Sequence, residues 1–209
     1  FYDSIFSTVL LVLPVFLLTQ DPYICYGAAI FASHILSSLG MLLLASKLKL
    51  DHPAALLAAM FFTFSEARYG VSTAISLITV QWMPFTLLFV HKYFDERRRI
   101  FLYWASLFYL MQITATAYHG IFFSIILLLF VLILSHQQNN FRFKKFALDA
   151  ALPVLIVGTV ACIYFMPYLQ EAHEFGANRS IAEQSVYGAP LATFFSLPSS
   201  HFFGPWTSH

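Results

Sequence analysis

Charged side chains are scarce in this sequence. Asp, Glu, Lys and Arg make up 10% of its 209 residues, while hydrophobic residues make up 59% and the mean hydropathy is +0.74. A soluble globular domain is typically about 25% charged, so these few charges cannot cover a surface that faces water. The composition therefore excludes a soluble domain. The formal net charge is only +1, which gives no electrostatic basis for binding nucleic acid.

The sequence also lacks the motifs of disulfide, metal and nucleotide sites. Its two cysteines, Cys25 and Cys162, lie in apolar surroundings and predict small buried side chains rather than a disulfide framework. His173, His201 and His209 show no HxH or HxxxH spacing, and there is no CxxC pair, glycine-rich phosphate loop or nucleophile elbow. Dinucleotide binding and soluble hydrolase chemistry have no support. We predict no cofactor, and the sequence leaves a divalent-metal requirement open.

Long apolar blocks dominate instead. Residues 121–134 (IFFSIILLLFVLIL) are apolar on every face of a helix, which is typical of a segment surrounded by lipid. A spanning helix needs about 20 mostly apolar residues. We therefore predict an all-α, polytopic transmembrane helical bundle of six to seven membrane segments, at residues 4–19, 23–46, 53–69, 71–93, 100–117, 120–135 and 150–169.

These segments predict two regions. Residues 1–169 form a transmembrane helical domain, and residues 170–209 begin a polar extracytoplasmic loop. Phe1 is not an initiator residue, so we expect a longer protein whose transmembrane domain is incomplete here at its N-terminus.

Basic residues predict the orientation of the segments. The connections at 47–52, 92–99 and 136–149 hold nine of the eleven Lys and Arg residues, and only Arg68 and Arg179 lie elsewhere. Basic loops face the cytoplasm. We therefore expect a multi-pass protein of the bacterial cytoplasmic membrane, with the region around Glu66 to Ser72, the turn at Tyr118 and the tail on the outer side.

Two stretches predict polar surroundings near the outer side. As a single helix, residues 100–134 would be about 52 Å long, so the chain must reverse at the polar stretch around Tyr118 and His119. Each arm is then barely long enough to span, which predicts a recessed turn beside an outward-opening cavity. Residues 71–81 carry Ser72, Ser76, Thr79 and Gln81. This stretch forms either an interfacial helix or the outer half of a span kinked at Pro84, and in both cases it borders the same cavity. The alternative is an ordinary span whose hydroxyls bond to their own backbone.

The polar tail carries a further candidate group. Arg179, Glu183 and Tyr187 are spaced i, i+4 and i+8 and would share one face of a helix. Such a face can bind a phosphate or sugar hydroxyls, with Arg179 as a bidentate donor. The alternative is an ion pair on a solvated helix.

Together these features resemble the polyprenol-phosphate-dependent membrane glycosyltransferases of the GT-C superfamily, and in particular their YfhO-like branch. The resemblance covers essentially the whole chain, although each motif is short. It rests on Pro22-Tyr23, Gly40-Met41, the Ala-rich residues 54–65, Gln81-Trp82-Met83-Pro84, Tyr118-His119-Gly120, the trio Arg179, Glu183 and Tyr187, Leu197-Pro198 and Phe203-Gly204.

The resemblance implies an inverting transfer of a sugar from a polyprenyl-phosphate-linked donor to a glycan, lipid or protein acceptor on the outer face. In that family the catalytic base is an acidic residue in the first outer loop. We expect only the end of this loop in the present chain, and the catalytic acid upstream of Phe1. Asp3 and Glu66 are the candidate catalytic acids in this chain. Arg68 and Arg179, the two outer basic residues, are candidate phosphate ligands.

The resemblance further implies substrate contacts from Gln81, Tyr118, His119, Glu183 and Tyr187. The family often places a histidine after the Ala-rich helix, and this chain lacks one at residues 69–72.

Two rival hypotheses remain at this stage. A transporter predicts ionisable groups at mid-membrane depth, and a non-catalytic scaffold or assembly subunit predicts no catalytic group at all. Arg68 can also be an ordinary interfacial anchor.

Overall fold

The computed structural model describes residues 5–65, 68, 75–138 and 141–174. The chain forms two compact units, Phe1–Tyr164 and Phe165–His209. In the second unit the structure describes the end of helix α9, where the rings of Phe165 and Tyr168 lie 6.1 Å apart. The described residues are all-α. They form α1 (Phe6–Thr19), α2 (Pro22–Lys47), α3 (His52–Thr63), α5 (Ile75–Ile78), α6 (Met83–Glu96), α7 (Ile100–Ala115), α8 (Ala117–Gln137) and α9 (Phe143–Glu174).

Three of the described helices are long and apolar enough to cross a membrane: α2, α8 and Phe143–Tyr168 of α9. The 26 residues of α2 rise about 39 Å at about 1.5 Å per residue, more than the hydrocarbon thickness of about 30 Å. Helices α1, α3 and α7 are apolar but shorter. The predicted all-α class and the multi-pass membrane character are confirmed at this level.

Large apolar side chains on α8 point away from the protein. Ile121, Phe122 and Leu128 are 66%, 64% and 59% exposed. A water-facing surface rarely carries such a continuous apolar patch, whereas lipid is a favourable environment for it. The exposed face of α8 is therefore consistent with contact with lipid.

Small residues on one face of α2 allow other segments to approach closely. Ala29, Ser33, Ser37 and Gly40 are all buried and recur every three or four residues. A Cβ atom added at Gly40 would lie 2.9 Å from a ring carbon of Phe85 in α6. Small residues at such a face are the usual basis of helix packing in membranes.

The chain reverses between α7 and α8 at one residue. Thr116 has extended backbone angles (φ −163°, ψ 119°) and is fully buried. A Cβ atom added at Gly120 would lie 2.4 Å from Cγ2 of Ile113, so glycine is needed where the two helices meet. The predicted reversal within residues 114–120 is confirmed, although α8 begins at Ala117 rather than at Gly120.

The predicted span at 71–93 is interrupted in the structure. Helix α5 ends at Ile78, and α6 begins at Met83 after four non-helical residues. Pro84 lies in the first turn of α6 and does not kink a continuous helix. Proline fits this position because the first N–H groups of a helix have no intrahelical partner.

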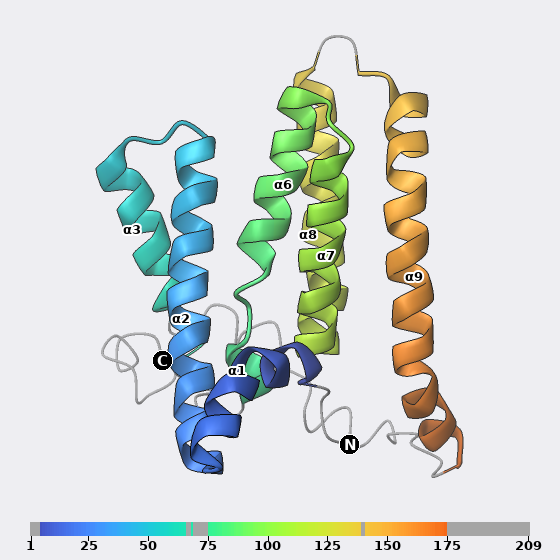
Figure 1. The fold of residues 1–209 in the computed structure, drawn as a ribbon. Coiled ribbons are helices and arrows are strands. Elements are labelled where there is room, and N and C mark those ends of the chain that lie inside the picture. Colours follow the sequence, from blue (N-terminus) through green and yellow to red (C-terminus); the bar gives the residue numbers. More distant parts are fainter. Residues whose placement is uncertain (1–4, 66–67, 69–74, 139–140, 175–209) are drawn as a thin grey trace, which may run out of the picture. The chain divides into compact units, whose positions relative to one another are not determined.

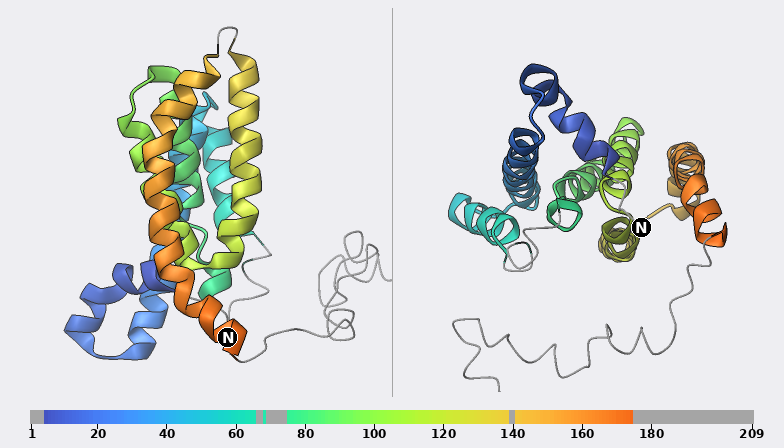
Figure 2. Two further views of the ribbon diagram at one scale, coloured as in Figure 1. Left: turned by 90° about the vertical axis from the view of Figure 1, so that its right-hand side faces the viewer. Right: turned by 90° about the horizontal axis from the view of Figure 1, so that it is seen from below.

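The basic connections lie together at one end of the helices. Figures 1 and 2 show that α2 ends, α3 begins, and α6 and α7 are joined at the upper end of Figure 1. Asp149 is buried at this end, where its carboxylate accepts hydrogen bonds from Tyr93 Oη (2.8 Å) and Arg99 Nε (2.6 Å). Helix α1 lies across the other end, beside the start of α2 (Figures 1 and 2).

Candidate functional site

Arg68 is a buried cation at the break between α5 and α6. Its side chain is 5% exposed. The guanidinium donates to the carbonyls of Thr63 (3.0 Å) and Ile78 (2.8 Å) and to Ser33 Oγ (3.0 Å). Thr63 and Ile78 are the last residues of α3 and α5, so the cation lies at two helix C-termini, where the macrodipole favours positive charge.

The helix that precedes Arg68 is shorter than predicted. The sequence predicts a membrane segment at residues 53–69 with Arg68 near its outer end. In the structure α3 ends at Thr63, and Ser33, the partner of Arg68, lies about 17 Å along α2 from its first residue at about 1.5 Å per residue. The guanidinium of Arg68 therefore lies beside the middle of α2, which is long enough to cross a membrane.

Gln81 joins the same hydrogen-bond network. Its side chain is fully buried, and Oε1 accepts a hydrogen bond of 2.8 Å from Ser33 Oγ. Ser33 thus connects Gln81 with Arg68. Among the described residues, Nε2 of Gln81 has no hydrogen-bond partner. A buried amide donor in this state is costly, by about 1–3 kcal/mol, unless a ligand or water supplies an acceptor.

Residues of α7 and its C-terminal turn complete the other side of the break. Gln112 Nε2 donates to the carbonyl of Thr79 at 2.8 Å. The hydroxyl of Thr116 donates to the carbonyl of Ser76. Non-helical backbone at membrane depth is tolerated where protein groups satisfy it. The non-helical backbone between α5 and α6 is therefore stabilised by hydrogen bonds from Arg68, Gln112 and Thr116. Ser33 of α2 holds Arg68 in place.

A cavity of about 740 Å³ opens beside this network. Arg68 and His119 both line it, so the structure brings together two residues predicted from separate parts of the sequence. Ser65 is a further polar residue on its wall. The other described residues that line it are apolar: Met41, Ala58, Phe61, Phe62, Leu77, Val80 and Met83.

The other predicted site residues lie elsewhere. Tyr118 is 54% exposed and does not line this cavity. Asp3, Glu66, Arg179, Glu183 and Tyr187 lie outside the described residues. Within the described part of the chain, no group of three or more His, Cys, Asp or Glu side chains is arranged to hold a metal ion.

Sequence reasoning missed two residues of the network. Ser33 belongs to the series Cys25, Ala29, Ser33 and Ser37, whose four-residue spacing of small side chains could have identified a packed helix face. Gln112 is the amide-bearing side chain within the apolar stretch 100–134. An amide in such a stretch predicts a buried hydrogen-bond partner.

Comparisons with protein-family models, with curated proteins and with solved structures found no match.

Proposed function

We propose that this chain is the membrane-embedded part of a glycosyltransferase that takes a sugar from a polyprenyl-phosphate-linked donor and transfers it to a glycan, lipid or protein acceptor at the extracytoplasmic face. The observation that carries the proposal is the cavity of about 740 Å³ in which Arg68 and His119 share an otherwise largely apolar wall. We also propose that the chain has six to seven membrane segments and that its basic loops face the cytoplasm.

The cavity matches the two-part chemistry of such a donor. Its aromatic and aliphatic wall suits an isoprenoid chain, and the guanidinium of Arg68 suits a phosphate oxygen. Hydrogen bonds to the carbonyls of Thr63 and Ile78 and to Ser33 Oγ fix the position of the guanidinium beside the cavity. Gln81 is fully buried and does not line the cavity, and its Oε1 accepts the hydrogen bond from Ser33 Oγ in the same network.

The proposed reaction needs one base and one departing phosphate. An acidic residue, Glu66 in this chain or an acid upstream, takes the proton of an acceptor hydroxyl. The hydroxyl oxygen then attacks the anomeric carbon, and the bond from that carbon to the phosphate oxygen breaks. Polyprenyl phosphate leaves with the bonding electrons, and Arg68 or Arg179 stabilises its added charge.

A transporter is the second candidate function. An intramembrane cation and an interrupted helix are both features that transporters use. In transporters, however, unwound carbonyls coordinate the transported ion. Here the carbonyls of Ser76, Ile78 and Thr79 accept hydrogen bonds from Thr116, Arg68 and Gln112. These contacts give the broken backbone a structural role, and the largely apolar wall of the cavity suits an isoprenoid lipid better than an ion.

Lipid binding tests the proposal. We expect the full-length protein in detergent to bind undecaprenyl phosphate about 10- to 100-fold more tightly than undecaprenol, because a charge-assisted hydrogen bond contributes about 1.5–3 kcal/mol. Native mass spectrometry measures both lipids in one titration. His119→Ala should reduce the affinity for both lipids, and Arg68→Lys should reduce the preference for the phosphate.

His34→Ala is the matched control. His34 lines a separate cavity between α2 and the end of α3, so its replacement should change neither affinity. Equal binding of the two lipids by the wild-type protein would contradict the phosphate site and leave the scaffold hypothesis.

A further inference from the structure

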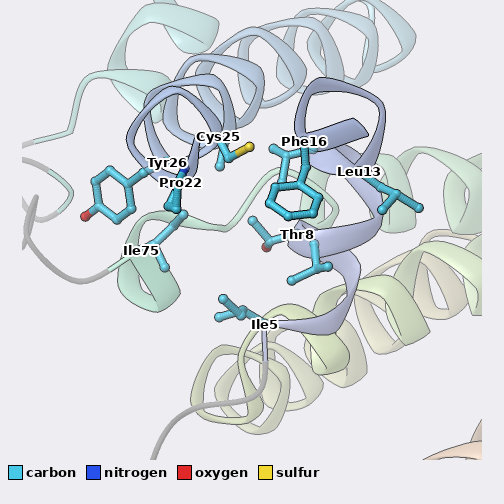
Figure 3. A pocket seen from close by; sticks show the side chains of 11 residues that line it. Ile5, Thr8, Leu13, Phe16, Pro22, Cys25, Tyr26 and Ile75 are labelled. Atoms are coloured by element: carbon cyan, nitrogen blue, oxygen red, sulfur yellow. The ribbon is translucent and has the colours of Figure 1, made fainter. Parts of the chain in front are cut away.

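A second cavity, of about 360 Å³, lies between α1 and the first turns of α2. It shares no lining residue with the cavity of Arg68. Its wall is mostly apolar. The lining residues include Ile5, Leu13, Phe16, Pro22, Cys25 and Ile75 (Figure 3).

Two hydroxyl-bearing residues line this cavity, Thr8 and Tyr26. The hydroxyl of Tyr26 lies at the far end of its ring from Thr8 (Figure 3). Thr8 is 2% exposed and lines the cavity (Figure 3). Among the described residues its hydroxyl has no hydrogen-bond partner. The neighbouring hydroxyls of α1 are satisfied, because Ser7 Oγ donates to the carbonyl of Met111 (2.7 Å) and Thr19 Oγ1 to that of Val15 (2.9 Å).

Water is a poor occupant of this cavity. A buried water molecule needs two to four polar partners, and Thr8 offers one hydroxyl in an apolar wall. Because α1 and α2 are apolar helices of a membrane protein, lipid molecules are the abundant neighbours of the cavity. An occupant must therefore be mostly hydrocarbon and carry one oxygen that can pair with Thr8.

The depth of the cavity identifies that oxygen. Its lining residues on α2 extend from Pro22 to Ala29, within about 10 Å of the start of the helix at about 1.5 Å per residue. Helix α2 is longer than the hydrocarbon thickness of about 30 Å, and its N-cap is Asp21, whose charge is costly in hydrocarbon. We therefore place its first turns in the interfacial layer of the bilayer. The ester carbonyls that join acyl chains to glycerol lie in this layer.

We propose that this cavity binds one acyl chain of a diacyl phospholipid, from the leaflet at which α2 begins, and that Thr8 Oγ1 donates a hydrogen bond to the ester carbonyl of that chain. The bound chain fills the space between α1 and α2 and holds α1 across the end of the bundle. This lipid is separate from the sugar donor, because a polyprenyl chain has no ester carbonyl to pair with Thr8.

The test compares two lipids and two threonines. Native mass spectrometry of the full-length protein measures binding of dioleoyl phosphatidylglycerol and of its diether analogue, which lacks the carbonyls. We expect the wild-type protein to prefer the diester about threefold to tenfold, the effect of one ordinary hydrogen bond. Thr8→Val should abolish the preference, and Thr19→Val, on the same helix, should preserve it.

A stability measurement separates this role from a purely structural one. Thr8→Val is nearly isosteric and removes an unpaired buried hydroxyl, so it should raise the unfolding temperature of the delipidated protein. A raised unfolding temperature together with an unchanged ester preference would overturn the proposal.

A variant that fills the cavity tests independently whether the lipid binds there. Val12 also lines the cavity, and Val12→Phe should weaken the binding of both lipids. Unchanged binding of both lipids to Val12→Phe would overturn the proposal. So would equal binding of diester and diether lipids to the wild-type protein.

Discussion

Individual polar side chains in this bundle mostly satisfy backbone groups. Arg68 and Gln112 donate to carbonyls at the break between α5 and α6. Thr86, in the second turn of α6, donates to the carbonyl of Trp82 at 3.0 Å. In a membrane each unsatisfied backbone group costs several kcal/mol. Such side chains are therefore what allows an interrupted helix to exist at this depth.

Asp95 provides a test at the residue scale, outside the membrane. Burial raises the pKa of its carboxyl, but the hydrogen bond from Lys47 Nζ (2.8 Å) and the charges of His91, Lys47 and Lys49 outweigh burial, so the pKa lies below its usual range. A lowered folded-state pKa contributes stability above the unfolded-state pKa of about 3.9, and this contribution disappears as the pH falls through the folded-state value.

We expect Asp95→Asn to lower the free energy of unfolding at pH 7 by about 0.2–1 kcal/mol. The effect is small because Asp95 is 42% exposed and solvent screens its ion pair with Lys47. The difference from the wild-type protein should shrink as the pH falls below about 4. Thermal unfolding in detergent at several pH values measures it. Glu96→Gln is the control, because Glu96 makes no ion pair within the described residues. A difference that grows with acidification would contradict the assignment.

At the scale of helices, close contacts depend on small residues at specific positions. Gly120 lies where the start of α8 meets Ile113 of α7, and Gly27 lies on α2 with nothing within 4 Å of an added Cβ atom. The two glycines are both helical, so they share the intrinsic cost of glycine in a helix and differ in packing.

We expect Gly120→Ala to destabilise the protein by about 1–3 kcal/mol, because its Cβ atom would clash with the side chain and backbone of Ile113. Gly27→Ala should be neutral or stabilising by up to about 1 kcal/mol, the propensity difference between the two residues. Chemical unfolding in detergent measures both variants. An equal effect at the two positions would show that α7 and α8 do not pack at this distance.

Hydropathy predicted the helices better than their interruptions. The apolar blocks predicted α2 and α8 closely, because lipid imposes length and apolarity directly on the sequence. The sequence predicts an interruption at Pro84, within either an interfacial helix or a kinked span, whereas the structure places the break at 79–82. Its actual position depends on Gln112 and Ser33, which lie on other helices. The partner of Arg68 was missed for the same reason, because Ser33 is 35 positions away in the chain.

For the whole molecule, the alternation of basic connections predicts which end faces the cytoplasm. The structure gathers the connections between α2 and α3 and between α6 and α7 at one end, and places α1 at the other (Figure 1). The sequence predicts an outward-opening cavity near Tyr118 and His119, and in the structure His119, but not Tyr118, lines a cavity together with Arg68. Its side of access stays a prediction, because orientation depends on the positive-inside rule.

Thiol labelling at the cavity wall tests whether the cavity opens to the outer side and binds a lipid-linked phosphate. Ser65 lines the cavity, and Arg98 lies in the basic connection before α7. With Cys25 and Cys162 replaced, we expect Ser65→Cys to react with an impermeant thiol reagent added outside intact cells, and Arg98→Cys to react only after permeabilisation. In proteoliposomes, undecaprenyl phosphate should slow the reaction of Ser65→Cys, and undecaprenol should do so much less. Labelling of Ser65→Cys only from the cytoplasmic side, or at a rate that undecaprenyl phosphate leaves unchanged, would contradict an outward-facing site for a lipid-linked phosphate.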